Sequence, residues 1–166
     1  MRILLLYDSS FRNTSELARV IAAELGDESS IQVLPIVDAN GIDLQQTDLL
    51  LIGGPLQHRT VSRLMRGWLE QLPYGALDGM PTALFDIRYS PAHGVIDPYA
   101  HALACAIRAR GATLLMSPMS FLAQGREGPL APGELGRAAT WAEEVVARAR
   151  DLVRLAQFQP EEGKVI

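Results

Sequence analysis

The chain has 166 residues, of which 48% are hydrophobic and 20% charged, with a formal net charge of −4 at pH 7. These values are typical of one soluble globular domain with a sizeable core. Charges of both signs are interspersed, and no basic stripe with interleaved aromatics appears, which argues against nucleic acid as a partner. One cysteine excludes an internal disulfide. No apolar run approaches the roughly 20 residues of a membrane span and no secretory signal is recognisable, so we expect a cytoplasmic protein.

The N-terminal segment predicts a buried strand, a polar turn and an amphipathic helix. Residues Ile3–Tyr7 form an uninterrupted apolar run, as in strands that are covered on both faces. A turn rich in Ser, Thr and Asn follows, and such a turn at a helix N-terminus suits a phosphate group. A second interpretation stays open, because Asn13 and Glu16 have the spacing of a capping box. The helix carries one apolar stripe, formed by Leu17, Val20, Ile21 and Leu25.

The rest of the chain alternates between strand and helix patterns. Further strands are predicted at Ile31–Val37, Leu49–Ile52, Thr82–Ile87 and Thr113–Met116. Helices are predicted over Val61–Leu72, from Asp97-Pro98 to about Ile107, and over Glu134–Leu155, while residues 38–48 form at most a short helix. Pro35 favours an edge strand. Inward-facing positions are expected to include Leu64, Trp68, Tyr99, Leu103, Cys105, Leu135 and Trp141.

This alternation predicts a parallel sheet with helices on both faces, which is a three-layer α/β/α sandwich. Five strands favour the order 2-1-3-4-5. We find no internal repeat and no domain boundary, so residues 1–157 are expected to form one domain and residues 158–166 a loose tail. The sequence contains no signal for an oligomeric state.

Ligands of such sheets bind beyond the carboxyl ends of the strands, beside the first strand. Three loops meet at this edge, at residues 8–14, 53–60 and 86–94. Gly53 and Gly54 allow close approach of the backbone to a ligand, and the third loop offers an aromatic ring and both signs of charge.

Four parts of the chain carry a resemblance to a known family: the segments ILLLYDSSFRNTSELA, DLLLIGGP and MPTALFDIRY, and the region from Gly111 to Val145. Over about residues 2 to 147 the chain resembles the flavodoxin family. The resemblance implies a flavodoxin-like sandwich that binds flavin mononucleotide (FMN) and transfers electrons. It places the phosphate loop on residues 9–14. Ser9, Asn13 and Thr14 match the family's hydroxyl or amide positions, and Ser10 occupies a variable one.

The chain departs from the family pattern in this loop. Phe11 stands where a hydroxyl residue is usual, and Arg12 stands where glycine is usual. Arg12 either gives the phosphate a counter-charge or fills its site. The loops that flank the flavin ring fall on residues 55–60 and 86–94. The candidate contacts there are Pro55, Leu56, Gln57, His58, Asp86, Arg88 and Tyr89.

Structural interpretations exist for the same residues. A histidine on a loop, such as His58, is more often solvated, and an arginine such as Arg88 is most often a surface charge. Tyr89 is equally compatible with packing over the sheet edge. Trp68 and Trp141 lie on apolar helical stripes and are expected in the core. The histidines and Cys105 lack metal-ligand spacing, so no metal is expected.

Three functions follow from these patterns. The first is FMN-dependent electron transfer to a redox partner protein or a small-molecule acceptor, at a less negative potential than in strongly acidic carriers. The second is a flavin-dependent oxidoreductase acting on a quinone or a porphyrinogen-like substrate. The third is a flavin-free binding module of the same fold. A hydrolase is disfavoured because no nucleophile elbow is present.

Overall fold

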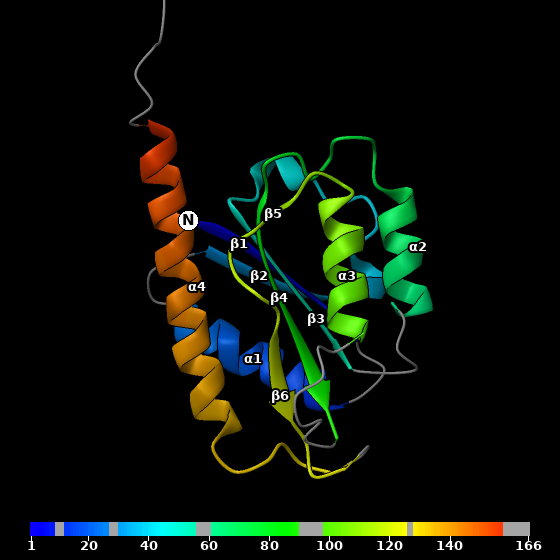
Figure 1. Ribbon diagram of the computed structural model, residues 1–166, viewed down its shortest axis with the longest axis vertical. Coiled ribbons are helices and arrows are strands. Elements are labelled where there is room, and N and C mark those ends of the chain that lie inside the picture. Colours follow the sequence, from blue (N-terminus) through cyan, green and yellow to red (C-terminus); the bar gives the residue numbers. More distant parts are fainter. Residues whose placement is uncertain (9–11, 27–29, 56–60, 90–97, 126–127, 158–166) are drawn as a thin grey trace, which may run out of the picture.

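The computed structural model describes residues 1–8, 12–26, 30–55, 61–89, 98–125 and 128–157. Within these ranges the strands pair in parallel in the order β2-β1-β3-β4-β5, and β6 also pairs with β4 (Figure 1). The strands are β1 (Arg2–Tyr7), β2 (Ser30–Pro35), β3 (Leu49–Pro55), β4 (Pro81–Arg88), β5 (Thr113–Leu114) and β6 (Met119–Leu122). The predicted strand order is confirmed, as is the position of β2 at an edge.

Helices cover both faces of this sheet. They are α1 (Arg12–Leu25), α2 (Arg63–Gln71), α3 (Pro98–Arg108) and α4 (Glu134–Gln157), with short 3₁₀ helices η1 (Ile36–Asp38) and η2 (Leu44–Gln46). Helices α1 and α4 pack together on one face, and α2 and α3 lie on the other (Figure 1). The predicted three-layer sandwich is therefore confirmed. None of the helices in the described ranges is long and apolar enough to cross a bilayer.

The apolar run of β1 divides its side chains between two cores. Ile3 and Leu5 belong to the core under α1 and α4, whereas Leu4 and Leu6 belong to the core under α2 and α3. All four side chains are buried. Because successive side chains of a strand point to opposite faces, a strand covered on both sides must be apolar throughout.

An aromatic cluster joins α4 to the sheet. The rings of Phe85 on β4, Phe121 on β6 and Trp141 on α4 meet edge to face, with centroids 5.7 to 6.3 Å apart. Gly53 on the neighbouring strand β3 lies beneath Phe85, and a Cβ at Gly53 would overlap the Phe85 ring. The packing of the Phe85 ring therefore requires a glycine at this position.

The fifth position of the sheet differs from the single strand predicted at 113–116. Leu114 pairs with Thr82 and Met119 pairs with Phe85, so residues 115–118 lie opposite residues 83–84 of β4. Two short strands, β5 and β6, therefore share this position. Pro118 has no N–H to donate to a ladder, which explains why pairing resumes only after it.

Three expected core side chains are exposed instead. Leu64 is exposed because α2 begins at Arg63 and turns Met65, Trp68 and Leu69 inward. Leu135 lies on the outer side of α4. The expectation that Cys105 is a core residue is wrong, since its side chain is exposed. Helix α3 is instead buried through Ala100, Leu103, Ala104 and Ile107, and the side chain of Tyr99 lies outside the described structure.

Replacing Gly53 by alanine is expected to destabilise the protein by about 1–3 kcal/mol or more, because the new Cβ overlaps the Phe85 ring. Gly67 in α2 is the matched control. A Cβ there meets no atom within 4 Å. Gly67→Ala should therefore stabilise the helix by about 0.5–1 kcal/mol. Urea denaturation followed by circular dichroism measures both variants, and equal effects would contradict the close contact.

Candidate functional site

The carboxyl ends of β1, β3 and β4 lie together at one edge of the sheet, and α1 begins at the same edge (Figure 1). The described structure includes part of each of the three predicted loops, at residues 8 and 12–14, 53–55 and 86–89. These parts lie at the same edge of the sheet, as predicted. Ser9, Ser10, Leu56, Gln57 and His58 lie outside the described residues. Their roles stay predictions.

The first turn of α1 has the electrostatics of an anion site. The first N–H groups of a helix have no partner within the helix, and the helix dipole adds positive potential there. This turn carries no acidic residue. Arg12, the first helical residue, is exposed. Its side chain is therefore not packed into the protein interior.

The Thr14 hydroxyl in this turn is buried without a hydrogen-bond partner among the described residues. The Thr14 side chain as a whole is fully buried. A buried hydroxyl without a partner costs about 1–3 kcal/mol relative to a satisfied one. Such a group at a helix N-terminus points to an acceptor that the protein alone does not provide.

Asn13 makes a contact that the sequence did not indicate. Its Nδ2 donates to the carbonyl oxygen of Gly128 at 2.6 Å, although the two residues are 115 positions apart. The helix already begins at Arg12, so Asn13 lies inside it and acts as a side-chain donor. The capping-box interpretation of Asn13 and Glu16 is therefore wrong. Asn13 ties the first turn of α1 to the segment between β6 and α4.

Glu134 anchors the far end of that segment. This buried residue, the first of α4, accepts from the Leu122 N–H at 2.9 Å and from Arg137 at 2.8 Å. The Arg137 guanidinium also lies 5.6 Å from the centre of the Phe121 ring. The segment that receives Asn13 is thus held by charged hydrogen bonds at its junctions with β6 and α4.

The end of β4 places charge inside the site. The Asp86 side chain is buried, and its Oδ1 accepts from Arg88 Nε at 3.3 Å. Arg88 is itself largely buried, which differs from the alternative of a surface charge. Tyr89 is half-buried and packs against the core under α1 and α4. This contact resembles the packing role considered for it as the alternative to a flavin contact.

A second carboxylate lies near this pair. Asp8 follows β1, is fully buried, and donates its N–H to the Gly53 carbonyl at 2.9 Å. Gly54 pairs with Asp86, so Asp8 and Asp86 stand on either side of the glycine on the two neighbouring strands. Gly54 places no side chain between them.

Comparison with solved structures identifies proteins of similar fold. The chain is similar to an archaeal flavodoxin, with a TM-score of 0.73 over 90% of this chain and 99% of that one, at 16% identity. It is also similar to oxidised flavodoxin 1 from Bacillus cereus, with a TM-score of 0.71 over 89% and 98% of the chains, at 18% identity.

A third similar structure is rubredoxin oxygen:oxidoreductase from Desulfovibrio gigas, with a TM-score of 0.68 over 90% of this chain and 36% of that one, at 14% identity. No protein-family model and no curated protein matches the sequence. At these identities the likeness shows the fold alone, and the chain has the flavodoxin fold.

Replacing Glu134 by glutamine is expected to destabilise the protein by about 1–3 kcal/mol, since hydrogen bonds to a buried charged group are lost. Glu144 is the matched control, because it pairs with Arg148 on the exposed side of the same helix. Glu144→Gln should change stability by less than about 0.5 kcal/mol. Thermal unfolding measures both, and a similar loss for the two variants would contradict an anchoring role for Glu134.

Proposed function

We propose that the chain binds FMN at the carboxyl edge of the sheet and transfers electrons to a redox partner protein or a small-molecule acceptor. The observation that carries the proposal is the buried, unpartnered Thr14 hydroxyl in the first turn of α1. The flavodoxin fold, shared with electron-transfer flavoproteins, supports it.

The phosphate of FMN would be held by the first turn of α1. The backbone N–H groups there donate to an anion, and the Thr14 hydroxyl supplies a further donor. The exposed Arg12 guanidinium adds a counter-charge. The contact between Asn13 and Gly128 keeps this turn in place, so Asn13 acts as a positioning residue.

The flavin ring would lie over the ends of β3 and β4. Gly54 keeps that approach free of a side chain on β3, and the half-buried Tyr89 follows the end of β4. When bound, FMN supplies one- and two-electron transfer. The protein residues bind and orient it. Because Arg88 is paired with Asp86, much of its charge is compensated within the site.

Titration of the full chain with FMN tests the proposal. Burial of the ring should quench flavin fluorescence. The Kd for FMN is expected to lie well below about 1 mM. Riboflavin, which lacks the phosphate, should bind more weakly. A chain with no FMN affinity would contradict the proposal and favour the flavin-free binding module.

Thr14→Val tests the carrying observation. The variant removes a buried hydroxyl that has no partner, so the stability of the chain without FMN should stay the same or rise. FMN affinity should fall by about fivefold to tenfold, which corresponds to about one hydrogen bond. Thr82→Val is the control. Thr82 is equally buried, but its Oγ1 donates to the Met80 carbonyl at 3.0 Å.

The two variants should therefore behave oppositely. Thr82→Val should lose about 1 kcal/mol of stability and keep the FMN affinity of the wild type. Denaturation and fluorescence titration give both readouts. A stability loss in Thr14→Val without a change in affinity would show that the hydroxyl serves the fold.

Arg12→Gln tests the counter-charge. FMN affinity is expected to fall by about twofold to fivefold at low salt, and the difference should shrink as salt is added. Arg19→Gln, an exposed change later in the same helix, should leave affinity unchanged. Tighter binding by Arg12→Gln would mean that the arginine obstructs the phosphate.

A further inference from the structure

The last turns of α4 extend beyond the core. Ala149 is the last buried residue of this helix, and residues 150–157 continue for about 12 Å at the usual helical rise. Figure 1 shows this end of α4 projecting past the edge of the sheet opposite the candidate site. Val153 and Leu155 are exposed there.

The apolar stripe of α4 continues along this projecting end. Val145 and Ala149 are buried, and Val153 and Leu152 follow them at helical spacing. Helices in water are stabilised mainly by packing of their apolar face rather than by intrinsic propensity. The apolar stripe of α4 continues at helical spacing beyond the last residue that the core buries. It is therefore suited to packing against a surface outside this chain.

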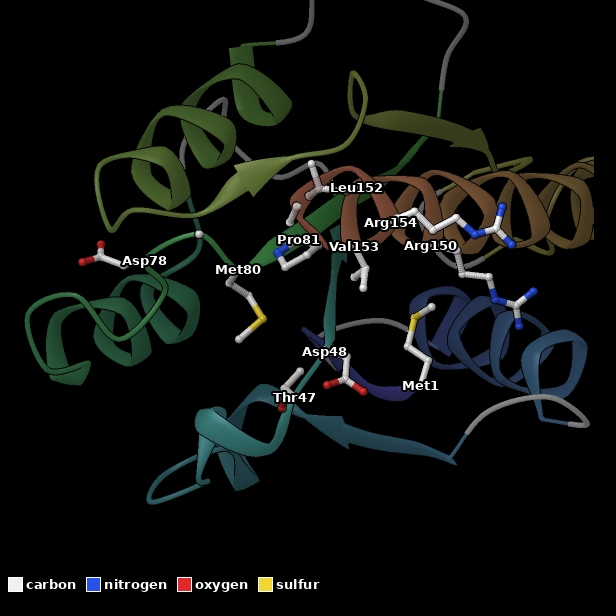
Figure 2. A pocket seen from close by; sticks show the side chains of 12 residues that line it. Met1, Thr47, Asp48, Asp78, Met80, Pro81, Arg150, Leu152, Val153 and Arg154 are labelled. Carbon is white, nitrogen blue, oxygen red and sulfur yellow. The ribbon is translucent and has the colours of Figure 1, made fainter. Parts of the chain in front are cut away.

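A groove lies under that stripe. A cavity of about 720 Å³ separates the end of α4 from the amino-terminal edge of the sheet. Figure 2 shows the Val153 side chain entering it from the helix, with Met1 and Met80 facing it from the other side. The two walls are thus largely apolar. We call this cavity and the projecting end of α4 the edge groove.

Charges of opposite sign border the two walls. Arg150 and Arg154 lie on the helix, and Asp48 lies on the sheet side, where its carboxylate also forms a 3.4 Å ion pair with the partly exposed Arg2 side chain. A hydrogen bond from the Arg2 backbone N–H lowers the pKa of Asp48, so this carboxylate is ionised at neutral pH. Arg154 makes a 3.7 Å contact with Asp151 in which both side chains are mostly exposed, and such a pair contributes little.

This surface is complementary to itself. It combines a projecting helix with a groove, and exposed arginines on one wall with a carboxylate on the other. A twofold axis places the same patch of two subunits face to face, so that each element meets its complement. We propose that the edge groove is the interface of a homodimer, in which the end of α4 from each copy packs into the groove of the other. Arg154 then faces Asp48 of the second copy.

The interface lies at the opposite edge of the sheet from the candidate FMN site. Dimerisation therefore leaves that site open and does not depend on it. Sedimentation velocity of the full chain over a range of concentrations tests the proposal with or without FMN. The expected result is a reversible shift from monomer to dimer as concentration rises.

Val153→Glu should raise the dimer dissociation constant by at least about tenfold, because it buries a charge in an apolar interface. Val37→Glu is the matched control, since Val37 is 48% exposed and Val153 is 45% exposed, and Val37 lies in η1 away from the groove. Circular dichroism confirms that both variants fold. Equal effects of the two substitutions would overturn the proposal.

Charge reversal gives a second, independent readout. Arg154→Asp and Asp48→Arg should each weaken the dimer, and the double variant should recover part of the loss, since the facing charges are again opposite. A wild-type chain that stays monomeric at every concentration would overturn the proposal. A monomer that binds an apolar fluorescent dye, and loses it in Val153→Glu, would instead identify a small-molecule site.

Discussion

The packing of Phe85 over Gly53 is the contact on which the rest of the structure depends. Gly53 on β3 and Phe85 on β4 are paired in the sheet, and the Phe85 ring covers the glycine. The same ring contacts Phe121 and Trp141. Edge-to-face aromatic pairs contribute about 0.5–1.5 kcal/mol each beyond the area they bury. This cluster seats α4 on the sheet. The position of α4 in turn determines where Glu134 meets the end of β6.

From that cluster, a continuous set of contacts reaches the candidate site. Glu134 holds the junction between β6 and α4, the segment between them presents the Gly128 carbonyl, and Asn13 binds that carbonyl. The first turn of α1 is thereby connected to the aromatic core through a side chain. Binding that requires no rearrangement of the protein avoids an entropic cost, so a turn held in this way would be preorganised for the anion that we propose it binds.

Much of the fold could be predicted because its determinants are local. The sequence shows the apolar runs of β1, β3 and β4 and the two glycines at the end of β3, and parallel topology then brings the loops together. The contact of Asn13 could not be predicted, since its partner is a backbone carbonyl 115 positions away. The burial of Arg88 had one local signal: it lies two positions from Asp86 on the same face of β4.

The predictions failed where polar and apolar residues do not alternate clearly along an element. Cys105 lies between Ala104 and Ala106 in the sequence, which suggested a core position, but it shares the outer face of α3 with the polar His101 and Arg108, one turn away on either side. The division of the fifth strand escaped prediction for a related reason. The predicted strand ended at Met116, before Ser117 and Pro118, where the structure has only an interruption.

That interruption also affects how the molecule resists aggregation. A long open sheet edge is a template for strands of other chains. Here one edge is broken by residues 115–118, and beyond the break residues 129–131 fold back along β6, where Ala131 donates to the Leu122 carbonyl. The opposite edge, β2, ends at a proline. The margin at β5 and β6 is therefore interrupted and partly covered against intermolecular strand addition, whereas β2 presents six residues at the other margin.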